Sequence, residues 1–73
     1  MDELQCFGKR LKELMQKENI SYVKLGERIC VDRETLRGWA NAKHYPNGYY
    51  LMKLSRYFNV TVDYLLFGDK NEG

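Results

Sequence analysis

The sequence has few of the residues that build metal sites, disulfide frameworks and membrane spans. Its 73 residues include one proline, one histidine and two cysteines. A zinc site needs more cysteine and histidine ligands than the chain has, so we expect no bound metal. The two lone thiols, Cys6 and Cys30, form no disulfide framework, and we expect both to be reduced and half buried. No apolar run approaches the ~20 residues that span a membrane.

Features of enzymes and of secreted proteins are also missing. The chain has no carboxylate pair, no nucleophile beside a base and no glycine-rich phosphate loop, and a domain this small leaves little room for a substrate cleft. The first residues are acidic and have no apolar signal-peptide segment. We therefore expect a cytoplasmic protein that is not an enzyme and that has no cofactor, no small-molecule ligand and no membrane partner.

Positive charge is concentrated in the middle of the chain. The formal net charge is +2, but residues 20–60 contain seven basic and three acidic side chains. The start of the chain and its tail are acidic or mixed. A locally basic segment suits a polyanionic partner such as nucleic acid. On charge alone, an ordinary solvated surface explains the same distribution.

Apolar residues recur at helical spacing, and the sequence predicts an all-α fold. The first helix is expected over residues 2–18, with Asn19 as its stop. Ser21 is a suitable N-cap for a second helix that ends near Cys30, and Asp32 for a third that runs to about Asn41. These two helices are joined by only about three residues, which forces them to cross steeply. Gly26 is the small residue that such a crossing needs, and the residues expected to meet inside it are Leu25, Ile29, Leu36 and Trp39.

Two further helices complete the predicted domain. Pro46 lies near the start of the fourth, and Asn59 suits its left-handed end. The inward stripe of this helix is expected to consist of Leu51, Leu54, Tyr57 and Phe58. Thr61 caps a fifth helix that ends at Gly68. No segment alternates strictly enough to predict a strand, so we expect one domain over residues 1–68 and a short polar tail over residues 69–73.

The third predicted helix has a polar face with side chains that could bind DNA. At 100° per residue, five positions fall within an arc of about 140°: Arg33, Glu34, Arg37, Gly38 and Asn41. An arginine can bind O6 and N7 of guanine, and a glutamate can accept a hydrogen bond from N4 of cytosine in the major groove. The solvent-facing side of any amphipathic helix gives the same pattern, so this face alone does not decide between the two interpretations.

An ordered set of residues resembles the Cro/repressor-type (XRE-like) helix-turn-helix family over about residues 5–68. The set is Phe7-Gly-Lys-Arg-Leu-Lys-Glu-Leu14, Asn19-Ile-Ser21, Leu25-Gly26, Ile29, Thr35-Leu-Arg-Gly-Trp39, Asn41-Ala-Lys43, Pro46 and Phe58-Asn-Val-Thr-Val-Asp-Tyr-Leu-Leu66. The resemblance implies a compact five-helix, lambda-repressor-like domain that binds double-stranded operator DNA, commonly as a two-fold dimer. It implies a small prokaryotic or phage transcriptional regulator, and of the two directions it favours a repressor.

The resemblance also implies which residues contact DNA. Arg33, Glu34 and Arg37 match base-reading or nearby phosphate positions, and Thr35 matches a less regular contact. Tyr22 matches a phosphate contact at the start of the second helix. The loop after the third helix follows the DNA backbone in the family, with Lys43 as its main phosphate contact. The full expected DNA-binding set is Tyr22, Arg33, Glu34, Thr35, Arg37, Gly38, Asn41, Lys43 and His44.

Several of these positions have a second explanation. His44 fits a solvated loop residue equally well, and Tyr45 fits packing over the corner at Pro46. Gly38 interrupts the third helix, where a glycine costs ~1 kcal/mol relative to alanine. Either close approach to a base or sugar requires it, or it is a neutral surface glycine.

The C-terminal third of the chain is rich in aromatic residues: Tyr49, Tyr50, Tyr57, Tyr64 and Phe67. Some must belong to the core, and exposed rings would form an adhesive patch. In the family this region often forms the dimer interface, so we expect a homodimer through it. The same aromatics also fit a second hypothesis, a protein-interaction module of the same fold such as an antitoxin or adaptor.

Two positions depart from the pattern of the family. The usual turn glycine is replaced by Cys30, which would be strained at positive φ. A common ion pair between the first and third helices is replaced by Met15 and Ala40. One unpaired buried charge costs roughly 3–5 kcal/mol, whereas an apolar replacement of both partners can be neutral or better. We therefore expect Met15 to pack near Ala40.

Restoring the ion pair tests this expectation. Met15→Arg alone should lower the melting temperature because it buries an unpaired charge. Adding Ala40→Glu should recover part of the loss, as measured by thermal denaturation followed by circular dichroism. A double variant that melts at or below the temperature expected from the two single variants would contradict the pairing.

Overall fold

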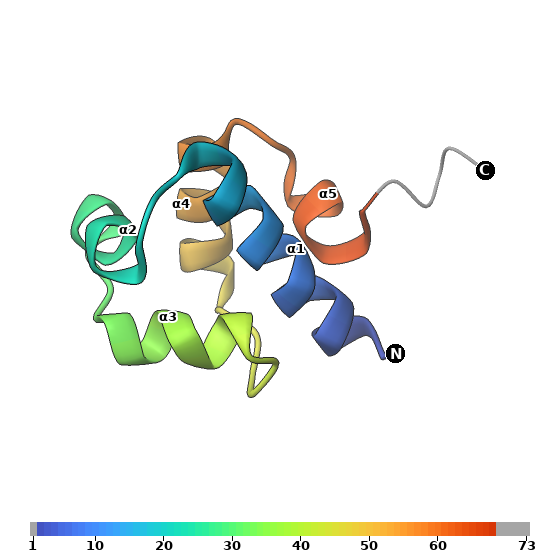
Figure 1. Ribbon diagram of the computed structural model, residues 1–73. Helices are drawn as coiled ribbons and strands as arrows, with labels where there is room; N and C mark the ends of the chain where they lie inside the picture. The colour runs from blue at the N-terminus through green and yellow to red at the C-terminus, as the bar shows by residue number, and fades with distance from the viewer. Residues whose placement is uncertain (1, 69–73) are drawn as a thin grey trace.

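The computed structural model describes residues 2–68 and contains five α-helices in this part of the chain (Figure 1). They are α1 (Glu3–Glu18), α2 (Tyr22–Ile29), α3 (Arg33–Ala40), α4 (Gly48–Phe58) and α5 (Val62–Phe67). No strand occurs between residues 2 and 68, and the predicted all-α, five-helix fold is confirmed. The predicted tail, residues 69–73, lies outside the described residues.

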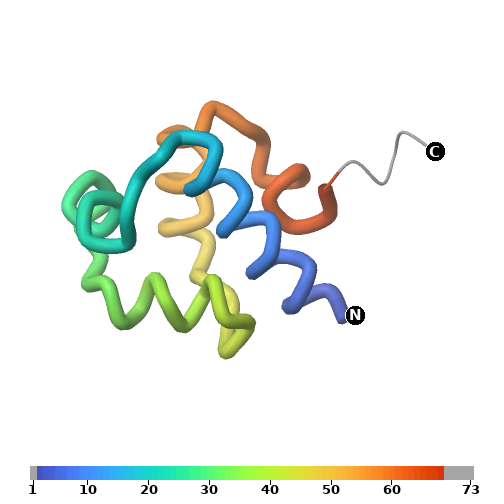
Figure 2. The backbone as a smooth tube through the Cα atoms, in the orientation of Figure 1, coloured from blue at the N-terminus to red at the C-terminus, as the bar shows by residue number. Residues whose placement is uncertain are grey.

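The long helix α1 packs against two helices that are far apart in the sequence. It contacts α3 and α5, whereas α2 contacts α3 and α4, and α4 also contacts α5. In Figure 2 the tube shows α2 at one end of the molecule and the start of α1 with α5 at the other. None of the five helices is long and apolar enough to cross a membrane.

One apolar core joins all five helices. Its buried members are Phe7, Leu11, Leu14, Met15, Leu25, Ile29, Leu36, Trp39, Ala40, Leu54, Phe58 and Leu65. The four residues expected inside the α2–α3 crossing are all among them. Met15 and Ala40 are also both members, although whether they touch stays a prediction.

The inward stripe of α4 differs from the expectation at one position. Leu54 and Phe58 are buried and Leu51 is half-buried, but Tyr57 is 36% exposed. Tyr57 lies 100° around the helix from Phe58, on the solvent side, and its ring packs edge-on against the Phe58 ring. Tyr50 takes the inward place instead, with its ring centroid 5.7 Å from that of Trp39.

Polar side chains begin four of the helices as expected from capping. Ser21 and Thr61 accept hydrogen bonds from the backbone N–H groups three residues later, as do Asp2 and Asn47. Asp32 occupies the N-cap position of α3 but makes no such bond. Its carboxylate instead accepts from the Thr35 hydroxyl, so Asp32 is the N-cap as predicted but lacks the usual bond to the backbone.

Four of the helices are followed by a non-glycine residue with a left-handed backbone. It is the C-cap itself in three of them and the residue after the C-cap in α3. The four residues are Asn19 (φ 55°), Cys30 (φ 61°), Ala42 (φ 61°) and Asn59 (φ 58°). Asparagine tolerates this conformation, whereas a residue with an ordinary Cβ is strained in it. The strain expected at Cys30 is therefore present. Cys6 is half-buried as expected, but Cys30 is exposed, because it follows Ile29, the last residue of the buried stripe of α2.

Replacing Cys30 by glycine should stabilise the protein. Glycine removes the left-handed strain of about 1–2 kcal/mol, and its extra chain entropy offsets roughly half of that gain. The melting temperature should rise by about 3–6 °C in thermal denaturation. Cys30→Ala is the matched control, since it removes the thiol but keeps the Cβ, and it should melt close to the wild type. A similar rise in both variants would show that the thiol, and not the backbone, is responsible.

Candidate nucleic-acid interface

The turn between α2 and α3 folds directly onto Gly26. The Val31 N–H donates to the Gly26 carbonyl at 2.9 Å. A Cβ on Gly26 would collide with the carbonyl oxygen of Val31 and would lie 3.6 Å from Cδ1 of Leu36. The prediction that Gly26 permits a close backbone approach is thus correct, and the backbone that approaches is the turn itself. This contact sets where α3 begins.

A second glycine places the other end of α3. At Gly8 of α1, a Cβ would lie only 2.5 Å from the Ala40 carbonyl oxygen and 3.2 Å from that of Trp39. The last turn of α3 therefore rests on the bare backbone of α1. Sequence reasoning did not assign this role to Gly8, although a glycine inside an otherwise strong helix is a signal of close packing.

With its inner side and both ends held, α3 presents a polar face to solvent. Arg33, Glu34, Arg37 and Asn41 are exposed, and Gly38 is half-buried. The Arg37 guanidinium lies 3.8 Å from the Glu34 carboxylate, with both side chains more than half exposed. Such a pair contributes little to stability, and DNA could replace it at small cost. Thr35 is half-buried and its hydroxyl already donates to Asp32, so it is the least available member of the predicted set.

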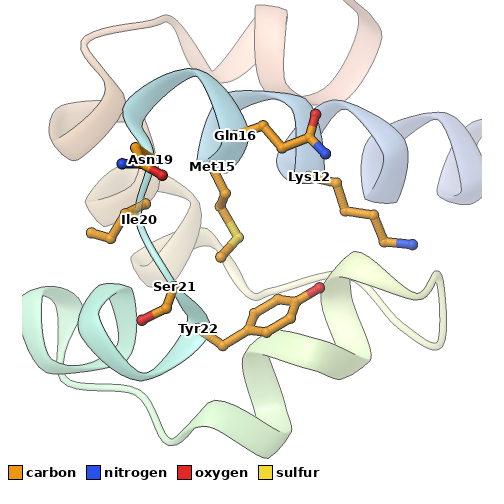
Figure 3. A pocket seen from close by; sticks show the side chains of 7 residues that line it. All are labelled: Lys12, Met15, Gln16, Asn19, Ile20, Ser21 and Tyr22. Carbon is orange, nitrogen blue, oxygen red and sulfur yellow. The ribbon is translucent and has the colours of Figure 1, made fainter.

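Tyr22 stands at the start of α2 beside a hollow lined by the end of α1. The lining residues are Lys12, Met15, Gln16, Asn19, Ile20, Ser21 and Tyr22. Figure 3 shows the Met15 side chain directed from α1 toward the ring of Tyr22. The first backbone N–H groups of a helix have no partner within it and attract anions. Lys12, which the sequence analysis did not select, adds an exposed positive charge to the same hollow.

The loop after α3 brings to the surface three residues that the sequence analysis considered. Lys43 and His44 are exposed, and the His44 ring lies against Gly38. The Tyr45 ring packs on Phe7 of α1, with 5.6 Å between centroids, while Pro46 is buried. This contact takes part of Tyr45 out of water and raises the pKa of its phenol, and the nearby carboxylates of Glu3 and Asp2 raise it further.

Two basic side chains stabilise the packing of helices through hydrogen bonds to backbone carbonyl groups. The Lys53 ammonium donates to the Ile29 carbonyl at the end of α2 (3.2 Å) and lies 5.1 Å from the centroid of the Tyr49 ring. The Arg10 guanidinium donates to the Leu65 carbonyl of α5 (2.7 Å). Neither role was predicted. No group of three potential metal-ligating side chains comes together within the part of the chain that the structure describes.

These features agree with the comparison to known protein families. A family model described as helix-turn-helix matches residues 11–65. The chain belongs to this family. The predicted membership is confirmed, and the match spans α2, the turn, α3 and α4 in full together with parts of α1 and α5.

Relatives of known role match the chain over most of its length. The HTH-type transcriptional activator BcrR of Enterococcus faecalis is 34% identical over 64 residues, which are 88% of this chain and 31% of the relative. The repressor protein C2 of Salmonella phage P22 is 31% identical over 93% of this chain and 32% of its own length. For the HTH-type transcriptional regulator ImmR of Bacillus subtilis, the identity is 35% over 86% of this chain and 50% of the relative. The chain thus spans 31% to 50% of the length of these proteins.

A solved structure shares the fold. It is a crystal structure of the P22 c2 repressor in complex with a synthetic operator, with a TM-score of 0.83 and 32% identity. The match covers 86% of this chain and 96% of the repressor chain. The predicted lambda-repressor-like architecture is therefore confirmed.

Proposed function

We propose that this chain binds double-stranded DNA sequence-specifically through α3, as the DNA-binding part of a transcriptional regulator. The observation that carries the proposal is the exposed polar face of α3, which glycine contacts hold at both ends. A similar domain, that of the P22 repressor, was solved with an operator. Relatives include both an activator and a repressor. The relative whose solved structure shares this fold is a repressor. On this likeness we propose that the present chain also belongs to a repressor.

The residues of this surface take different parts in the proposed complex. Arg33, Glu34 and Arg37 read base edges or nearby phosphates from the major groove, with Asn41 on the same face. Tyr22, with Lys12 beside it, holds a phosphate at the start of α2. Lys43 neutralises a further phosphate from the loop after α3.

Selection from a randomised duplex pool tests the proposal. Wild-type protein should enrich a defined sequence, and its affinity should fall steeply with salt because phosphate contacts release counterions. Arg33→Ala should change the enriched sequence. Lys43→Ala should weaken all sequences alike and reduce the slope of log affinity against log salt by about 1.

Arg56→Ala is the matched control for Lys43→Ala. Arg56 lies in the last turn of α4, and Figure 1 shows that end of α4 on the side of the molecule away from α3. Its loss should leave the salt slope nearly unchanged. If wild-type protein binds no duplex at low salt, the proposal fails, and the alternative of a protein-interaction module (an antitoxin or adaptor) takes its place.

We further propose that the domain acts as a homodimer through its C-terminal region. An apolar groove lies there, lined by Glu3, Tyr45, Leu51, Leu66 and Phe67. Tyr45 and Phe67 are each more than 40% exposed. A single recognition helix reads only a short half-site, and a two-fold dimer doubles the length of DNA that is read. A second copy of the chain is therefore the occupant proposed for this groove.

A charge placed in the groove should break the dimer. Phe67→Glu should shift the protein from dimer toward single chains in sedimentation equilibrium, because an unpaired carboxylate would be buried at the interface. Tyr49→Glu, at an exposed ring outside this groove, is the control and should leave the mass unchanged. A thermal melt of Phe67→Glu would separate loss of assembly from loss of folding. Wild-type protein that sediments as a single chain at high concentration would contradict the dimer.

A further inference from the structure

The outer face of α3 lacks a side chain at Gly38, and a ring from the following loop occupies that place. The Cβ position of residue 38 would lie 3.0 Å from Nε2 of His44, 3.5 Å from Cε1 and 3.7 Å from Cδ2. The imidazole thus stands where a side chain of residue 38 would begin. Among residues 2–68, the chain neighbours of Gly38 aside, no other side chain is as close to this position.

The backbone after α3 places His44 over Gly38. Ala42 has left-handed φ, and its N–H donates to the Trp39 carbonyl at 3.2 Å. The Lys43 N–H donates to the Gly38 carbonyl at 2.8 Å. This pair of bonds is the Schellman arrangement that reverses the chain at the end of a helix. Figure 2 shows the loop turning back at the end of α3 before the chain rises into α4.

The ring lies on the side of α3 that is proposed to face DNA. Gly38 falls at one border of the polar arc that also contains Glu34, Arg37 and Asn41, all of which are exposed. His44 is exposed as well. A group at the border of the arc, supplied by a loop outside the helix, is placed to meet the wall of the major groove, which consists of phosphates.

We propose that His44 contacts a DNA backbone phosphate and that Gly38, because it has no side chain, leaves room for the His44 ring against α3. An imidazole N–H donates to a phosphate oxygen, which is the contact that residue 38 cannot make itself. The proposal rests on the proposed DNA-binding function. It also gives a reason for a glycine in the middle of α3, where helix propensity disfavours it.

Four proteins test the proposal on the duplex that wild-type protein enriches: wild type, Gly38→Ala, His44→Ala and the double variant. His44→Ala should bind about tenfold more weakly, the size of one charge-assisted hydrogen bond. Gly38→Ala should lose a similar factor because its Cβ displaces the ring. In the His44→Ala background, Gly38→Ala should have no further effect. The melting temperature of Gly38→Ala should be equal to or above that of wild type, because His44 is an exposed side chain that can move aside.

These four proteins form a double-mutant cycle, which separates three possible roles of Gly38. Equal loss from Gly38→Ala with and without His44 would mean that DNA itself approaches the glycine, and would overturn the proposal. No loss in either background would mean a neutral glycine, and would overturn it too. His44→Phe adds a readout of chemistry, since it keeps a ring on Gly38 but has no N–H donor. It should bind as weakly as His44→Ala, and wild-type affinity in His44→Phe would contradict the proposal.

The affinity loss in His44→Ala should be the same for every sequence tested. A change in the enriched sequence would overturn the assignment of this contact to phosphate. Wild-type binding together with unchanged affinity in His44→Ala would refute this inference alone and leave the DNA-binding function standing. Absence of wild-type binding to any duplex would remove both.

Discussion

The helix α3, which is proposed to read DNA, rests on bare backbone at both of its ends, and the other features of the surface depend on this. At its start, the turn lies on Gly26, and at its end, the Ala40 carbonyl lies on Gly8. A methyl group at either glycine would push the backbone of α3 or its preceding turn away by roughly 1 Å, the difference between these contacts and an ordinary van der Waals distance. Reading of base edges tolerates no such shift, because donors and acceptors in the major groove must be met within a few tenths of an ångström. The absence of two side chains thus sets the position of the side chains that are proposed to read DNA.

The strained positions of the chain lie at helix ends, where they reverse the backbone. Asparagine occupies two of them, and Cys30 and Ala42 occupy the two that flank α3. The second of these reversals brings the loop back onto the helix. The conformational cost at Ala42 and the missing side chain at Gly38 therefore belong to one arrangement, in which a loop residue extends the surface of a helix that is only eight residues long.

Local signals in the sequence accounted for most of the fold. Residues close together in the chain determine where helices start, as at Ser21 and Thr61, and where they end, as at Asn19 and Asn59. They also determine the buried pattern of α2 and α3. Periodicity and capping rules therefore predict these features. The misses were of another kind. Arg10 meets the Leu65 carbonyl 55 positions away, and Gly8 meets Ala40 across a helix crossing. Such pairings depend on how the helices dock, which no short window of sequence contains. The identity of the DNA-contacting residues remains a prediction, since only binding measurements can test it.

The bond between Arg10 and α5 links two properties that would otherwise be separate. α5 has only six residues, too few to be stable as an isolated helix, and Arg10 holds its Leu65 carbonyl while lying 5.8 Å from the centroid of the Tyr64 ring. Leu66 and Phe67 of the same helix line the groove proposed for a second chain. Docking of α5 on α1 and association of two chains would then be thermodynamically coupled, each increasing the population of the other. In such a scheme a residue of the first helix tunes the affinity between subunits without touching the partner.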